Sequence, residues 1–167
     1  MVNPGEMTKE MSRYIDIEEY HAVERAHAYY KEMVAFILDY LRSLNKESGK
    51  LRILEWGAGT GLVTEDLAKL PNVEITALEY DSKCYKFLVD HVAGMGVKCV
   101  LGDIVTYNEQ NKFDIIVSVF AHDHVRYDMA QDLVSNISNN LRVGGQYIMG
   151  GELLPLYNSS KERIQSL

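Results

Sequence analysis

The chain has 167 residues, 47% hydrophobic and 25% charged, which fits a single globular domain of ordinary composition. Its formal net charge of -7, with no run of Lys or Arg, argues against a nucleic-acid partner, because phosphate binding needs a basic surface. The sequence has no membrane-length apolar stretch, no apolar core of a secretory signal and only two cysteines without metal spacing. It therefore predicts a cytoplasmic protein with no membrane contact and no metal.

Residues 1–50 are predicted to be a helical segment that precedes the core. Residues 1 to about 12 are polar and contain Pro4 and Gly5, so we expect them to be frayed or loosely docked. Ile17 to Leu44 has a helical pattern with room for one break, and its apolar stripe predicts a face packed on the core. A polar turn at 45–50 leads into the core, which we place at residues 51–167.

Strands and helices alternate through the core. We expect strands at residues 51–56, 73–79, 97–102, 113–120 and 146–154, and helices at 62–70, 82–95 and 126–141. Ser82 is the expected N-cap of the second of these helices, and Gly144-Gly145 the expected turn before the last strand. The alternation predicts an α/β fold with a doubly wound, mostly parallel sheet, in which ligands bind at the carboxyl ends of the strands.

The first strand runs into a glycine cluster, "ILEWGAGTG". Gly57, Gly59 and Gly61 allow positive φ angles and a close approach of a ligand to the backbone, although a tight turn without a ligand has the same pattern. Gly61 comes one position too early for the G-x-G-x-x-G dinucleotide fingerprint. Glu55 would repel a pyrophosphate and attract an ammonium group. The cluster therefore favours a ligand other than a dinucleotide.

Acidic residues follow the next two strands. Glu79 lies about twenty residues after the glycine turn, at the offset from which an acid reaches ribose hydroxyls. Asp103 and the Ile104 N–H could bond an adenine edge. A solvated acid at Glu79 and an Asx turn at Asp103 are the structural alternatives.

Two histidines follow the fourth strand in "SVFAHDHV". His122 and His124 are predicted to act as a general base or to position a substrate, since histidine titrates near neutrality. The alternatives are a metal site, for which no third ligand is evident, and a helix cap at Asp123 with both histidines exposed.

In order and spacing, "ILEWGAGTG", "ALEYD", "LGDI", "FDIIVSVFAHDHV" and "LRVGGQYIMGGE" resemble the motifs of class I S-adenosylmethionine-dependent methyltransferases. The resemblance covers about Arg52 to Leu154. It implies a Rossmann-like core with strand order 3-2-1-4-5 and S-adenosylmethionine as the cofactor, with S-adenosylhomocysteine as its product. In the "A-L-H-H-V" segment of small-molecule members, the second histidine corresponds to His124. This chain has His122 and Asp123 where that segment has Leu and His, so a catalytic role for His122 is not inherited.

The resemblance also implies roles for matching residues. Glu55 would face the methionine ammonium, and Glu79 the ribose hydroxyls. The remaining cofactor contacts that it implies are Gly57, Ala58, Gly59, Gly61, Tyr80, Asp103, Ile104, Ser118 and Phe120. In this family a segment before the first strand often covers the substrate pocket, which makes Tyr14, Tyr20 and His21 expected substrate contacts, with packing on the sheet as the alternative. For Tyr29 and Tyr30 we expect packing.

The family's last two strands have no counterpart in this sequence, which ends as a helix pattern begins near Ser159. We therefore expect the core to end after strand five. The exposed edge of that strand predicts either a homodimer or a terminal helix folded across it.

The sequence thus predicts a methyltransferase that transfers a methyl group to an O, N or C nucleophile of a small molecule. One alternative is a non-catalytic or truncated S-adenosylmethionine-binding module that acts through a partner or a dimer. The other is a nicotinamide-dependent oxidoreductase, which the glycine spacing disfavours.

Overall fold

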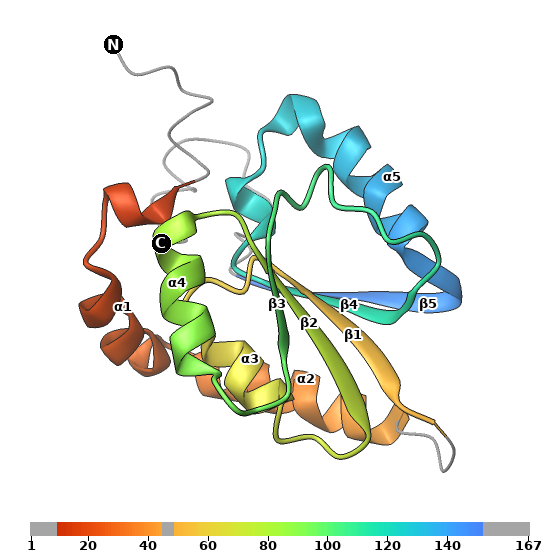
Figure 1. The fold of residues 1–167 in the computed structure, drawn as a ribbon, viewed down its shortest axis with the longest axis horizontal. Coiled ribbons are helices and arrows are strands. Elements are labelled where there is room, and N and C mark those ends of the chain that lie inside the picture. The colour runs from red at the N-terminus through yellow and green to blue at the C-terminus, as the bar shows by residue number, and fades with distance from the viewer. Residues whose placement is uncertain (1–9, 45–48, 152–167) are drawn as a thin grey trace, which may run out of the picture.

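The computed structural model describes residues 10–44 and 49–151, whose centre is a five-stranded sheet (Figure 1). The strands are β1 (Leu51–Trp56), β2 (Val73–Glu79), β3 (Lys98–Leu101), β4 (Phe113–Val119) and β5 (Leu141–Gly150). Each adjacent pair is parallel, and the order is β3-β2-β1-β4-β5. The predicted α/β class, parallel sheet and strand order are confirmed.

Helices cover both faces of the sheet. The α-helices are α1 (Ile17–Val23), α2 (Tyr30–Leu44), α3 (Leu62–Leu67), α4 (Ser82–His91) and α5 (Ala130–Asn140). On one face, α2 and α3 bury their apolar stripes against alternate residues of β1, β2 and β4. On the other face, α5 packs near Trp56 and Ile116. None of the helices in the described ranges is both long and apolar enough to cross a membrane.

The N-terminal region contains more structure than the sequence predicts. A 3-10 turn, η1 (Met11–Arg13), is tied to the core because the backbone and hydroxyl of Ser12 both donate to the Asp81 carboxylate, at 2.8 and 2.9 Å. Residues 10–12 are therefore docked rather than frayed, while residues 1–9 lie outside the described part of the chain. A second 3-10 turn, η2 (Glu24–Ala26), forms the expected break between α1 and α2.

Two local predictions are wrong for physical reasons. The N-cap of α4 is Asp81 and not Ser82, because the Asp81 carboxylate accepts from the N–H groups of Lys83 and Cys84. Gly144 and Gly145 do not form a turn before β5 but lie inside it, where the register against β4 shifts. Gly144 has a φ of +76°, and a Cβ on Gly145 would lie 2.9 Å from the Arg142 carbonyl oxygen.

Some element ends also differ from those predicted. The three core helices are shorter than expected. The helix expected at 62–70 ends at Leu67, the one expected at 82–95 ends at His91, and the one expected at 126–141 begins at Ala130. Before α5 come two 3-10 turns, η3 (His122–His124) and η4 (Tyr127–Met129). The strand expected at 146–154 starts earlier, at Leu141, and the helix expected near Ser159 lies outside the described residues.

Candidate active site

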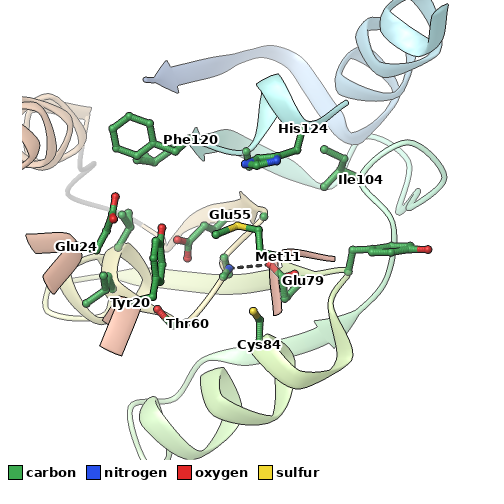
Figure 2. Close-up of a pocket in the computed structure, with 18 of the residues that line it drawn as sticks. Met11, Tyr20, Glu24, Glu55, Thr60, Glu79, Cys84, Ile104, Phe120 and His124 are labelled. Carbon is green, nitrogen blue, oxygen red and sulfur yellow. Dashed lines mark hydrogen bonds between the residues drawn. The ribbon is translucent and has the colours of Figure 1, made fainter. Parts of the chain in front are cut away.

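A cavity of about 990 Å³, counting its open mouth, lies between the carboxyl ends of β1 to β4 and residues of the N-terminal segment (Figure 2). Its position is the one expected for a ligand site in a parallel α/β sheet. The lining residues are Met11, Tyr20, Glu24, Tyr30, Glu55, Gly57, Ala58, Gly59, Thr60, Leu62, Val63, Glu79, Tyr80, Cys84, Asp103, Ile104, Val119, Phe120, Ala121, His124 and Val125.

The turn after β1 forms the floor of the cavity. The N–H groups of Gly57 and Ala58 both donate to the Leu78 carbonyl of β2, which holds the turn against the sheet. A Cβ on Gly57 would lie 2.3 Å from the Ala121 Cβ, so glycine is required for this close packing. A Cβ on Gly59, in contrast, would meet nothing within 4 Å, although its φ is +56°. Gly59 therefore presents open backbone to a ligand.

Gly61 has a structural position and does not line the cavity. It is the N-cap of α3 with a φ of +91°, and an added Cβ would lie 2.8 Å from Leu88 Cδ1 of α4. The third glycine of the cluster is thus explained by the packing of α3 on α4.

Glu55, at the end of β1, is a buried carboxyl that faces the cavity (Figure 2). Only 3% of its surface is exposed, and its Oε2 has no hydrogen-bond partner among the described residues. Burial raises the pKa of Glu55 to about 8, and the negative charge of Glu79 adds to that rise. The Thr64 hydroxyl partly offsets it, although the two groups lack the geometry of a hydrogen bond. A cationic group in the cavity would therefore gain a partner and ionise Glu55.

Glu79, at the end of β2, is held in place by backbone groups. Its Oε2 accepts from the Gly59 N–H at 2.7 Å and its Oε1 from the Asp81 N–H at 2.7 Å. Burial raises the pKa of Glu79, and these two bonds oppose the rise. Each carboxylate oxygen has a second lone pair, so both can still accept from vicinal hydroxyls.

The residues predicted for an adenine site reach the same cavity from β2 and β3. Tyr80, which is 41% exposed, and Ile104 both line it. Asp103 also lines it, and its Oδ1 accepts from the Val105 N–H at 2.9 Å. The Asx turn that the sequence left as an alternative is therefore present, and it fixes the carboxylate at the cavity wall.

At the end of β4, Phe120 lines the cavity and Ser118 does not. Phe120 lines the cavity with a φ of +53°, an uncommon conformation for a bulky residue. Ser118 is fully buried and does not line the cavity. Because Val117 and Val119 pack on the α2 face, the alternating side chain of Ser118 points to the α5 face.

The two histidines are also separated. His124 lines the cavity opposite Glu55 (Figure 2). His122 does not line it, and its Cε1 lies 3.0 Å from the position of a Cβ on Gly151. In the described ranges, no group of three or more His, Cys, Asp or Glu side chains has an arrangement that could hold a metal ion.

Of the three residues expected to contact substrate, only Tyr20 lines the cavity. Tyr14 is 56% exposed and lies outside it. His21 packs instead against the rings of Phe87 and His91, at centroid distances of 4.8 and 4.3 Å. Burial and the neighbouring His91 lower the pKa of His21.

Sequence reasoning missed several cavity residues. Tyr30 is buried as expected, but it also lines the cavity and stacks with Phe120. Tyr29, expected to pack, is 81% exposed. Glu24 and Met11 reach the cavity from turns, where no periodic pattern identifies an inward face.

Every formally charged residue in the cavity lining is acidic. Its lining includes the carboxyl groups of Glu24, Glu55, Glu79 and Asp103, and it includes no Lys or Arg. Such a cavity favours a ligand with a positive charge. S-adenosylmethionine, which carries a sulfonium and an ammonium group, fits this set of residues better than a dinucleotide, whose pyrophosphate would be repelled.

Comparison with known proteins agrees with this geometry. The chain is 28% identical over 116 residues to a malonyl-[acyl-carrier protein] O-methyltransferase of Bacillus cereus, covering 69% of this chain and 42% of that protein. It is 36% identical over 75 residues to a tRNA1(Val) (adenine(37)-N6)-methyltransferase of Actinobacillus pleuropneumoniae, covering 41% and 32%. This chain thus spans less than half of either relative.

A solved structure shows the same fold. CalS10 from Micromonospora echinaspora, an amino pentose methyltransferase with S-adenosylmethionine bound, has a TM-score of 0.67 at 23% identity and covers 85% of this chain and 58% of that one. Residues 53–145 match a family model described as a methyltransferase domain. This match covers more than half of the chain, which therefore belongs to the S-adenosylmethionine-dependent methyltransferases of class I, as its motifs predicted.

Proposed function

We propose that this chain binds S-adenosylmethionine in the cavity and transfers its methyl group to a nucleophilic atom of a small molecule. The observation that carries the proposal is the row of carboxyl groups at three neighbouring strand ends, Glu55, Glu79 and Asp103, which open onto one cavity. In this proposal Glu55 binds the ammonium group, Glu79 the ribose hydroxyls, and Asp103 with Ile104 the adenine edge. Gly57, Ala58 and Gly59 form the floor, and Tyr80 packs on the adenine.

The cofactor supplies an already activated methyl group on a positively charged sulfur. The protein's own contribution is then to align the two reactants and to exclude water. Phe120 and Tyr30 form an apolar wall for this purpose. In this proposal His124, which lines the cavity, accepts a proton from a nucleophile that must lose one, and His122, which does not line it, has no such role.

A small-molecule acceptor is supported by the charge of the protein and of the site. The chain has a formal net charge of -7, and no Lys or Arg lines the cavity, so a nucleic-acid acceptor is disfavoured. A relative named for a tRNA substrate keeps RNA as the second candidate. A cytoplasmic location is part of the proposal, and it is supported by the free thiols of Cys84 and Cys99.

The test is a transfer assay with S-adenosylmethionine labelled on its methyl group, using a small-molecule panel and a tRNA pool as acceptors. We expect label in a small molecule, and its loss in Glu79→Ala. Binding of the cofactor with transfer to neither acceptor class would favour the non-catalytic module. Transfer to tRNA alone would favour the second candidate.

A further inference from the structure

One carboxylate of the cavity has no role in the proposed function. Glu55, Glu79 and Asp103 lie at the ends of β1, β2 and β3, where they are assigned to the cofactor, whereas Glu24 enters from η2, in the segment above the strand ends. Figure 2 shows Glu24 at the same end of the cavity as Tyr20 and Phe120, with Ile104 at the opposite end. If Ile104 binds the adenine as in the proposed function, Glu24 lies at the end of the cavity where the methyl group and the acceptor meet.

Neighbouring contacts hold Glu24 at the cavity and leave its carboxylate available. The adjacent Arg25 points to α3, donating to Glu65 Oε2 at 2.8 Å, to Asp66 Oδ2 at 3.1 Å and to the Leu62 carbonyl at 3.2 Å. These bonds anchor η2, and they direct the guanidinium of Arg25 to α3. Among the described residues, no side chain forms a hydrogen bond or ion pair with the Glu24 carboxylate.

Aromatic rings share the cavity with this carboxylate. Burial raises the pKa of Tyr20, and the negative charge of the nearby Glu24 raises it further. Tyr30 stacks on Phe120 at a centroid distance of 6.3 Å with an interplanar angle of 16°. All three rings line the cavity. A cavity that combines a carboxylate with aromatic rings suits an ammonium group, since a ring face also attracts a cation.

From this wall, and resting on the proposed function, we propose that the methyl acceptor is a small molecule that carries an ammonium group, and that Glu24 selects it. An anionic acceptor would meet the carboxyl groups of the cavity and no Lys or Arg. The Bacillus cereus relative is named for a malonyl acceptor, whose free end is a carboxylate. The inference therefore assigns this chain a different acceptor class from that relative.

The test uses three probes of one shape and different charge: benzylamine, benzyl alcohol and benzoate. Their binding is measured by NMR titration at pH 7, with and without saturating S-adenosylhomocysteine. The proteins are the wild type, Glu24→Gln and a matched control, Glu18→Gln, which makes the same charge change at an exposed site outside the cavity. Unfolding curves of all three proteins check that each one folds.

We expect the wild type to bind benzylamine roughly tenfold more tightly than benzoate, and Glu24→Gln to lose most of that preference. Glu18→Gln should behave as the wild type, and all three proteins should bind S-adenosylhomocysteine within about twofold of each other. Equal affinity for benzylamine and benzoate, or an unchanged preference in Glu24→Gln, would overturn the inference. Failure of S-adenosylhomocysteine to bind would contradict the proposed function instead. Glu24→Gln should then still weaken benzylamine binding relative to Glu18→Gln, with Glu55 contributing equally in both proteins.

Discussion

The buried carboxyl of Glu55 links the stability of the protein to pH. Burial raises its pKa from 4.5 to about 8, so the folded protein holds a proton that the unfolded chain releases between those values. The contribution of Glu55 to the free energy of unfolding therefore falls as pH rises through this window, by about 1.4 kcal/mol for each pH unit. Urea unfolding of the wild type and Glu55→Gln at pH 5 and pH 8 should show the wild type losing more stability. Parallel pH profiles would contradict the assignment.

Two glycines of the turn after β1 provide a matched pair. Gly61→Ala places a methyl group 2.8 Å from Leu88 Cδ1 at a φ of +91°, and we expect a loss of about 2–4 kcal/mol in stability. Gly59→Ala has open space around the new Cβ, so we expect only the roughly 1–2 kcal/mol of backbone strain. Its larger effect should be on binding of S-adenosylhomocysteine, measured by calorimetry. The assignment fails if Gly61→Ala weakens binding more than Gly59→Ala does.

Residue positions at the strand ends were predictable, but side-chain directions beyond them were not. Glu55, Glu79 and Asp103 follow parallel strands, whose carboxyl ends meet at one edge of the sheet. The motifs also predicted Ser118 and His122 as site residues, but neither lines the cavity. The alternation of side chains along β4 turns Ser118 away from it, and the η3 turn does the same for His122. The spacing of residues in the sequence does not show which way these side chains point.

At the scale of elements, Arg25 anchors η2, which carries Glu24, to α3 through Glu65 and Asp66. These ion pairs are partly exposed, so their contribution is modest. Arg25→Ala should speed amide hydrogen exchange in residues 17–26 by roughly threefold, equal to about 0.6 kcal/mol. Arg42→Ala, which breaks the exposed pair with Asp39, serves as the control. Exchange that is unchanged in both variants would show that packing alone holds the segment.

The outer edge of β5 leads us to predict a dimer. Among the described residues β5 pairs only with β4, and Val143 near its start is 93% exposed. We expect the edge to pair with a second copy, giving a dimer in size-exclusion chromatography with light scattering. Val143→Lys should weaken that dimer, whereas Val134→Lys, a similar change on α5, should not. A clean monomer would instead favour a segment of the same chain folded across the edge.

For the molecule as a whole, the strand order was predictable because alternating strands and helices allow few parallel arrangements. The docking of the N-terminal segment was not. It depends on Ser12 meeting Asp81 and on Arg25 meeting Glu65, which are contacts between distant parts of the chain that no local pattern encodes. That docking encloses the cavity and brings Glu24 and Tyr20 to it.

The function of the protein depends on whether the carboxyl groups at the strand ends bind S-adenosylmethionine. Calorimetric titration with S-adenosylhomocysteine tests it most directly, using the wild type, Glu79→Ala and Glu74→Ala, with NAD as the competing ligand. Glu74 lies on the same strand as Glu79 but outside the cavity. We predict one binding site, at least tenfold weaker in Glu79→Ala and unchanged in Glu74→Ala, with no heat from NAD. Binding of NAD without binding of S-adenosylhomocysteine would show that the cavity is not an S-adenosylmethionine site.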